Sequence, residues 1–265
     1  KCAFLYGYLD EEIYMRLPQE YQSPDGSVCR LKKSIYGLKQ APRAWNARLT
    51  DDLKRLGYQP FLHAECIFWR EKEGIKVFLL IYVDDFLLVT STTVESDILQ
   101  IKSEIGKLYK IKDLGRAEYF LGINLEYSSG FIKLSQSTYI RKILERFRME
   151  QCKPVISPML PRALVSDREE MTNEETNNMM TTPYREAIGA LMFLSVRTRP
   201  DISVAVGTLA MHVQEPRNMH WEAVKRVFRY LQGTINEGFV ITAVPDEVLT
   251  LQVYADDDWD TDVEY

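Results

Sequence analysis

Two adjacent aspartates interrupt the longest apolar stretch of the sequence, and this feature constrains the fold more than any other. The stretch covers residues 75–90, with Asp84 and Asp85 just past its middle. It predicts two apolar strands that meet at a turn. Tight turns favour Gly or Asn, whose backbones accept positive φ angles, yet this turn offers Val83 and Asp84. Because the strands are apolar on both faces, we expect the carboxylates to lie at the end of a buried layer, where they repel each other.

A divalent cation removes that repulsion. Mg²⁺ prefers carboxylate oxygens and leaves coordination positions for substrate phosphates. Paired carboxylates that hold two ions are the usual machinery for in-line attack on phosphorus. The competing interpretation is that aspartate is simply common in turns, which is the more frequent explanation for an isolated Asp-Asp pair. The absence of a turn glycine and the apolar flanks favour the metal interpretation here.

Composition excludes several classes of protein. The 265 residues are 46% apolar and 11% aromatic, which is enough to bury a core and excludes disorder. Four cysteines without a C-x-x-C pair and three scattered histidines argue against a disulfide scaffold or a zinc site. The longest uninterrupted apolar run within the stretch 75–90, residues 77–83, is far short of the ~20 residues of a membrane span. No signal peptide is visible, and a start at Lys1 without Met suggests a piece of a longer protein that is not secreted.

The net charge of −5 is unevenly distributed. Residues 246–265 carry eight acids and no base, whereas the most basic stretch is 29–55. Smaller basic clusters lie within 141–148 and 217–229. Such runs are usually solvated helix faces; the alternative is a surface for a polyanion such as nucleic acid.

Apolar periodicity predicts a chain that mixes strands and helices. The first helix stripe ends at Gly57, and a second hairpin turns at residues 128–130. The predicted helices are 41–56, 94–108, 139–147, 184–196, 200–213 and 216–231, and further strands are expected at 238–242 and 249–255. Residues 154–183, with four prolines and a polar run, are the predicted linker.

The residues around the aspartates resemble a known family. Residues 82–85, Tyr-Val-Asp-Asp, resemble the Tyr-x-Asp-Asp turn of reverse transcriptases, and their surroundings resemble the copia-type retrotransposon enzyme. Further similar segments follow in the family's order along nearly the whole chain: 3–7, 36–45, 119–123, 134–136, 152–154, 198–201 and 225–231. A lone Tyr-x-Asp-Asp is weak evidence, but this ordered set is strong. It implies an RNA-directed DNA polymerase, a nucleotidyltransferase, within the Pol polyprotein of an LTR retrotransposon, a transposable element that depends on DNA integration.

The resemblance implies an α+β fold with a polymerase palm, an antiparallel sheet with helices on one face, and partial fingers and thumb. It places the fingers, palm and start of the thumb in residues 1–153 and the linker in 154–183. A mostly helical connection region follows in 184–245, and a truncated ribonuclease H start in 246–265. Another palm-fold nucleotidyl transferase is opposed by the helical block at 184–231.

The resemblance also assigns roles. Asp84 and Asp85 are implied to be catalytic ligands of Mg²⁺, with Mn²⁺ as an alternative. The implied nucleotide contacts are Cys2 and Ala3 through backbone N–H groups, Phe4 as a steric gate against the 2′-hydroxyl, Tyr36 and Gly37. The implied primer contacts are Tyr82, Phe120, Leu121 and Gly122. Asp256 matches the first catalytic position of ribonuclease H, and the proton donor is left open between Lys110 and Lys112.

Each implied role has an alternative explanation that is purely structural. Phe4, Trp45 and Phe120 can be core aromatics, and Trp45 is expected to be one because it lies on a helix stripe. Gly37 and Gly122 can serve only to relieve backbone crowding. The implied partners are an RNA template, a DNA primer, the RNA–DNA hybrid, deoxynucleoside triphosphates, and the integrase and ribonuclease H segments of the polyprotein. No membrane partner is expected. The implied location is a cytoplasmic virus-like particle, with the nucleus as an alternative.

Two departures from the family pattern lead to expectations of inactivity. The family has an Asp two residues before Lys1 that supplies the first metal ligand, so we expect this chain to be inactive as an isolated polymerase. The chain stops nine residues after Asp256, so we expect no ribonuclease H activity. The alternative function is a non-catalytic nucleic-acid-binding or scaffolding remnant of a decayed or domesticated element.

Overall fold

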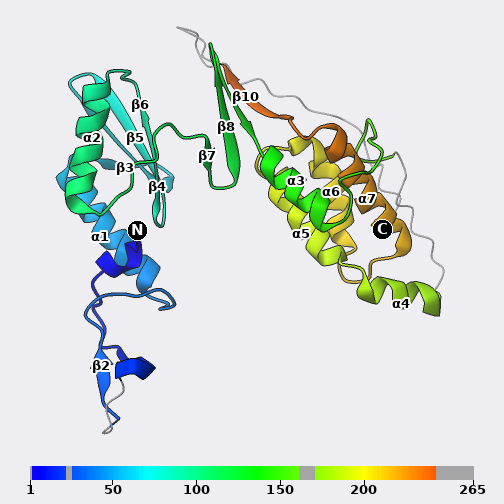
Figure 1. Cartoon of the computed structure of the whole chain (residues 1–265), viewed down its shortest axis with the longest axis horizontal. Helices are drawn as coiled ribbons and strands as arrows, with labels where there is room; N and C mark the ends of the chain where they lie inside the picture. Colours follow the sequence, from blue (N-terminus) through cyan, green and yellow to red (C-terminus); the bar gives the residue numbers. More distant parts are fainter. Residues whose placement is uncertain (1, 22–25, 161–170, 243–265) are drawn as a thin grey trace. The chain divides into compact units, whose positions relative to one another are not determined.

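The chain forms two compact units, Lys1–Ala117 and Glu118–Tyr265 (Figure 1). The computed structural model describes residues 2–21, 26–160 and 171–242. Both units combine helices with antiparallel strands, which confirms the α+β class. Among the helices described, none is long and apolar enough to cross a membrane.

The first unit is built around a four-stranded antiparallel sheet of order β3-β4-β5-β6. Its strands are β3 (Gln59–Phe61), β4 (Ala64–Lys72), β5 (Ile75–Tyr82) and β6 (Asp85–Thr90). Helices α1 (Ala41–Arg55) and α2 (Glu95–Leu108) pack on one face of this sheet. The smaller elements are η1 (Ala3–Tyr6), η2 (Gln19–Tyr21), and the strand pair β1 (Tyr14–Arg16) and β2 (Val28–Arg30).

The core of this unit is formed by the predicted apolar stripe of α1 and by alternate residues of the sheet strands. Trp45, Leu49 and Leu53 of α1 are buried against alternate residues of β5, of which Leu79 is fully buried. The opposite face of β5 is partly exposed, and Tyr82 at its end is 58% exposed. Although these strands are apolar on both faces, the described helices cover one face of the sheet, so the expected buried layer is buried on one side.

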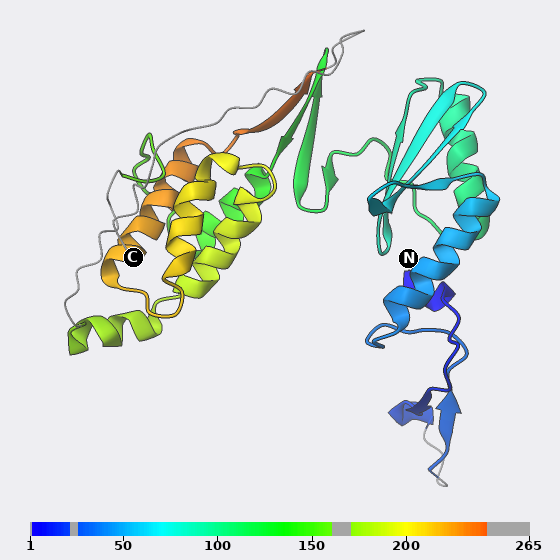
Figure 2. The same ribbon diagram turned by 180° about the vertical axis from the view of Figure 1, so that it is seen from behind.

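The second unit contains a four-stranded sheet of order β10-β9-β8-β7 and a helix bundle (Figure 2). Its strands are β7 (Tyr119–Phe120), β8 (Ile123–Ser128), β9 (Phe131–Ser135) and β10 (Gly238–Thr242). Its helices are α3 (Ser137–Arg146), α4 (Asn173–Thr181), α5 (Tyr184–Ser195), η3 (Pro200–Ile202), α6 (Ser203–Met211) and α7 (Asn218–Gly233). The predicted second hairpin is present as β8 and β9, with Gly130 at a φ of 82° in its turn.

The compact units divide earlier than the predicted boundary at residue 153. The reason is that Ile140, Ile143 and Leu144 of α3 belong to the core formed by α5, α6 and α7. Within the predicted linker, α4 begins at a Thr172 cap, whose hydroxyl accepts the N–H of Glu175 at 3.1 Å. The predicted functional domains stay a prediction, and the predicted strand at 249–255 lies outside the described residues.

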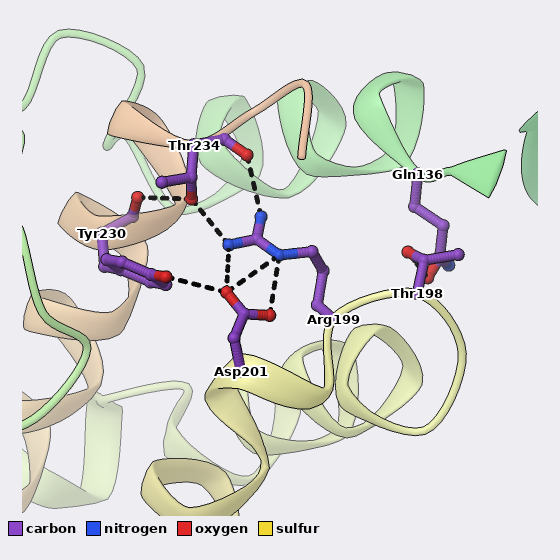
Figure 3. A network of polar contacts seen from close by, with 6 residues as sticks. All are labelled: Gln136, Thr198, Arg199, Asp201, Tyr230 and Thr234. Carbon is purple, nitrogen blue, oxygen red and sulfur yellow. Dashed lines mark hydrogen bonds and ion pairs between the residues drawn. The ribbon is translucent and has the colours of Figure 1, made fainter. Parts of the chain in front are cut away.

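A buried arginine ties the segment before α6 to the end of α7 (Figure 3). Arg199 is 1% exposed, and its guanidinium donates to the carboxylate of Asp201 and to the carbonyl and hydroxyl oxygens of Thr234. The Tyr230 hydroxyl donates to the same carboxylate at 2.9 Å. These bonds satisfy an otherwise costly buried charge, so the family-like segment 198–201 has a clear structural role here.

Candidate active site

The turn between β5 and β6 consists of two residues, as the sequence predicts. Tyr82 pairs with Asp85 across the end of the hairpin, which leaves Val83 and Asp84 in the turn. Val83 has a φ of 53°, a left-handed conformation that is unfavourable for a β-branched side chain. Backbone strain of this kind persists only where surrounding contacts enforce it, and it concentrates at functional sites.

Asp84 is half-buried and accepts three hydrogen bonds from residues distant in sequence. The backbone N–H of Cys2 donates to Oδ2 at 3.0 Å, and that of Ala3 donates to Oδ1 at 3.3 Å. The Tyr36 hydroxyl donates to Oδ1 at 2.6 Å. This hydrogen bond, together with burial, raises the pKa of Tyr36 to about 12. Three donors on one carboxylate fix its orientation.

Asp85 has different surroundings. Its side chain is exposed, and it makes no hydrogen bond or ion pair with the residues that the structure describes. One carboxylate of the pair is therefore held by the protein, whereas the other faces solvent. The burial that was expected to make the two groups repel each other is not found at Asp85.

The predicted nucleotide-binding residues come together around Asp84. The rings of Phe4 and Tyr36 lie 4.6 Å apart, and the carbonyl of Phe4 accepts a short hydrogen bond from the Ser34 hydroxyl. Gly37 follows Tyr36 with a φ of 97°, which supports the interpretation that a glycine is needed there for backbone conformation. Tyr36 lies 48 residues from Asp84 in the sequence and Cys2 lies 82 residues away, but the fold brings both into contact with its carboxylate.

The predicted primer-contacting hairpin lies in the second unit. Phe120 pairs with Ile123, so Leu121 and Gly122 form a two-residue turn with φ angles of 50° and 87°. A Cβ atom on Gly122 would lie 3.2 Å from the ring of Phe193, so a close packing contact also explains this glycine. Asp256 lies outside the described residues.

The donor set at the β5–β6 turn fits a divalent cation in part. Asp84 and Asp85 offer hard carboxylate oxygens, which Mg²⁺ and Mn²⁺ prefer, and Asp85 is free to coordinate. Within residues 2–21, 26–160 and 171–242, no cluster of three His, Cys, Asp or Glu side chains could hold a metal ion. The two aspartates therefore suit an ion whose remaining ligands come from substrate, water or another part of a longer protein.

The basic stretch 29–55 is partly neutralised within the fold. Arg48 and Arg55 both pair with Asp52, which is 2% exposed, and Arg30 pairs with Glu12. The groove beside α1 is lined by acids as well as by Arg43, Arg48 and Arg55. The charge available for phosphate contacts is thus smaller than the sequence count suggests.

Trp45 is predicted to be a core residue, and in the structure it also makes a hydrogen bond to the aspartate turn. Trp45 is 5% exposed, as predicted, and its indole N–H donates to the carbonyl oxygen of Val83 at 3.0 Å. The helix stripe revealed the burial of this side chain. No local pattern indicates a hydrogen bond across 38 residues to the aspartate turn.

Comparisons with known proteins identify the family of this chain. Residues 1–161 match the family described as reverse transcriptase (RNA-dependent DNA polymerase). The chain is 40% identical over 243 residues to the retrovirus-related Pol polyprotein from transposon TNT 1-94 of Nicotiana tabacum, covering 89% of this chain and 18% of that protein. It is 35% identical over 264 residues to the retrovirus-related Pol polyprotein from transposon RE2 of Arabidopsis thaliana, covering 98% and 17%.

A shorter relative is matched over most of its length. The chain is 33% identical over 258 residues to the putative transposon Ty5-1 protein YCL074W of Saccharomyces cerevisiae, covering 96% of this chain and 80% of that protein. No solved structure matches the chain. The chain thus spans less than a fifth of the two Pol polyproteins. It belongs to the reverse transcriptase (RNA-dependent DNA polymerase) family, among the Pol polyproteins of retrotransposons.

Proposed function

We propose that this chain carries the nucleotidyl-transfer site of the RNA-directed DNA polymerase of a copia-type LTR retrotransposon. The observation that carries the proposal is the strained β5–β6 turn, where Asp84 is held by three hydrogen bonds beside a free Asp85. In this reaction a primer 3′-hydroxyl attacks the α-phosphorus of a deoxynucleoside triphosphate and pyrophosphate leaves. Positioning and electrostatic stabilisation provide most of the catalysis in such transfers.

Asp84 and Asp85 would hold Mg²⁺, because they supply the oxygen ligands that this ion prefers. When bound there, the metal would help to ionise the primer hydroxyl and to neutralise charge on the leaving group. The protein's own contribution is to orient the Asp84 carboxylate through the N–H groups of Cys2 and Ala3 and the Tyr36 hydroxyl.

The residues around Asp84 would form the nucleotide pocket. Backbone N–H groups attract anions. Those of Cys2 and Ala3 donate to Asp84 in this structure, so they would contact a triphosphate only by exchanging this partner. The Phe4 ring would crowd a ribose 2′-hydroxyl, and its contact with Tyr36 fixes the ring from one side. The implied roles of Tyr82 and of residues 120–122 in holding the primer are part of the same proposal.

The isolated chain is proposed not to extend primers by itself. A two-metal site normally needs a third carboxylate that bridges the ions, and Asp84 and Asp85 have no third ligand among the described residues. The palm, fingers and thumb assignments, the ribonuclease H start, and the partners (RNA template, DNA primer, nucleotide and other Pol segments) belong to this proposal as well.

A second candidate function is a non-catalytic remnant that binds nucleic acid or acts as a scaffold. It is favoured by the incomplete ligand set in the described residues.

Primer extension distinguishes these functions. The chain would be assayed alone and within a longer Pol segment that includes the residues preceding it, with an RNA template, a DNA primer and Mg²⁺. We expect extension by the longer segment, loss of extension in Asp84→Asn and Asp85→Asn, and retention in Asp51→Asn, an exposed carboxylate on α1. Template binding without extension by the longer segment would favour the second function. Equal extension by Asp84→Asn and the unmodified segment would reject the metal role.

A further inference from the structure

We propose that Trp45 is a positioning residue for the aspartate turn, acting through its indole N–H on the carbonyl of Val83. The inference rests on the proposed function, since the orientation of Asp84 and Asp85 matters only if they bind a metal ion. It gives a positioning role to a side chain for which the sequence pattern indicates only packing in the core.

The hydrogen bond acts on the most constrained residue of the hairpin. Trp45 Nε1 lies 3.0 Å from the carbonyl oxygen of Val83, whose φ is 53°. A valine rarely adopts this conformation unless neighbouring contacts enforce it. The Val83 carbonyl lies in the turn between the paired residues Tyr82 and Asp85, and it takes its hydrogen bond from α1.

The Trp45 ring is itself held in place by neighbouring aromatic residues. Its centroid lies 5.1 Å from the Tyr109 ring in an edge arrangement and 6.1 Å from the Tyr6 ring. The Tyr109 hydroxyl donates to buried Asp52 at 2.8 Å, and the Tyr6 hydroxyl accepts the N–H of Lys110 at 3.0 Å. Rotation of the indole away from Val83 would disturb these bonded neighbours, so the donor is preorganised.

Asp84 and Asp85 depend on the hydrogen bond between Trp45 and Val83 to different extents. Asp84 has three side-chain hydrogen bonds of its own. The Asp85 carboxylate has no such partner in the described parts of the chain, so the backbone of the turn determines its direction. Because Trp45 fixes that backbone at Val83, we expect Asp85 to be the more sensitive of the two ligands to loss of the indole N–H.

The test separates the N–H group from the bulk of the ring. One variant is Trp45→Phe, and a second replaces Trp45 with benzothienylalanine, which keeps the bicyclic shape but has sulfur in place of N–H. The matched control is Trp69→Phe on β4, a half-buried tryptophan of the same unit whose indole N–H donates to none of the described residues. Two readouts are measured on the full chain: the NMR signals of the Asp84 and Asp85 amides, and the affinity for Mn²⁺.

We expect both Trp45 replacements to broaden or shift the two amide signals and to weaken Mn²⁺ binding by about threefold to tenfold, as for the loss of one hydrogen bond. The control variant Trp69→Phe should change neither the amide signals nor the affinity for Mn²⁺. In a Val83→Gly background, where positive φ is not strained, the effect of the replacement should fall below about twofold. A purely structural role of Trp45 would instead give the same effect in both backgrounds.

The inference is overturned if the benzothienylalanine variant keeps the amide signals of the unmodified chain. If the unmodified chain binds no Mn²⁺ at the aspartates, the metal part of the proposed function fails. The amide signals still decide separately whether Trp45 positions the turn.

Discussion

Asp84 and Asp85 are neighbours in sequence but have different surroundings in the fold. Asp84 is half-buried and accepts hydrogen bonds from Cys2, Ala3 and Tyr36, whereas Asp85 is exposed. The first arrangement orients a carboxylate, and the second leaves one free to bind a cation. The sequence predicts the pair and its turn. It does not predict that the two side chains differ in hydrogen bonding and exposure, because this difference depends on contacts between residues 48 to 82 positions apart.

The Phe4 ring provides a prediction about sugar selection. Phe4→Ala in the longer Pol segment should relax discrimination against ribonucleotides by at least about tenfold, because the ring would no longer crowd the 2′-hydroxyl. The measurement is the ratio of kcat/KM for deoxynucleotide and ribonucleotide incorporation. Phe78→Ala, which removes a half-buried ring on β5, is the matched control. Unchanged selectivity in Phe4→Ala would remove the gate assignment.

Gly7 provides a prediction about how η1 is positioned. A Cβ atom there would lie 2.9 Å from backbone atoms of Ala44 and Trp45, which is too close. Gly7→Ala should therefore destabilise the packing of η1 on α1 by about 1–3 kcal/mol, measured by hydrogen exchange of the α1 amides. Gly106→Ala in α2 has only ordinary contacts at 3.8 Å, and it should be neutral or stabilising. Equal protection in both variants would contradict this account of Gly7.

At the scale of elements, apolar periodicity predicts helices well, whereas a helix within a polar segment is not predicted. The stripe that contains Trp45 and Leu53 gives α1, and Gly57, with a φ of 83°, follows its end. Helix α4 lies in a stretch whose prolines and polar residues indicate a linker, and its Met179 is buried by tertiary contacts. Local pattern cannot show such burial, because the partner side chains come from distant elements.

The start of α7 is expected to be sensitive to acid. His220 is 3% exposed; its Nδ1 accepts the Arg217 N–H at 3.0 Å, and its ring stacks on His212. Burial, followed by the proximity of His212 and Arg217, lowers the pKa of His220 to about 4, against the opposing influence of Glu175. Between about pH 6.5 and 4 the unfolded chain binds a proton that the folded chain excludes, so folded-state stability should fall as the pH falls through this window.

Urea unfolding of the second unit at about pH 7 and about pH 5 tests this effect. His220→Gln is the control variant, because a glutamine oxygen can accept the Arg217 N–H without titrating. We expect the unmodified chain to lose stability on acidification and His220→Gln to lose less. An identical loss in both chains would assign the acid sensitivity to other groups.

At the scale of the whole molecule, two separate cores are expected to unfold separately. Leu53 lies in the core of the first unit and Leu191 in that of the second, and both are fully buried. Leu53→Ala and Leu191→Ala should each destabilise their own unit by about 2–5 kcal/mol. Calorimetry should show two transitions, each lowered by one variant. A single transition lowered equally by both would indicate one cooperative unit.

The fold class and the position of the aspartate turn were predictable from the sequence, but the contacts that support the turn were not. Apolar runs and turn spacing predict the hairpin that carries Asp85. The contacts of Tyr36 with Asp84 and of Trp45 with Val83 depend on how α1 and the segment before it pack on the sheet. A one-dimensional pattern contains no information on such packing.

The most direct test of the central claim is paramagnetic NMR of the 265-residue chain titrated with Mn²⁺. The account predicts that the amide signals of Val83, Asp84 and Asp85 broaden first, and that Asp84→Asn and Asp85→Asn each abolish this broadening while Asp51→Asn does not. Broadening that appears first elsewhere, or that persists in both aspartate variants, would contradict a metal site at the β5–β6 turn.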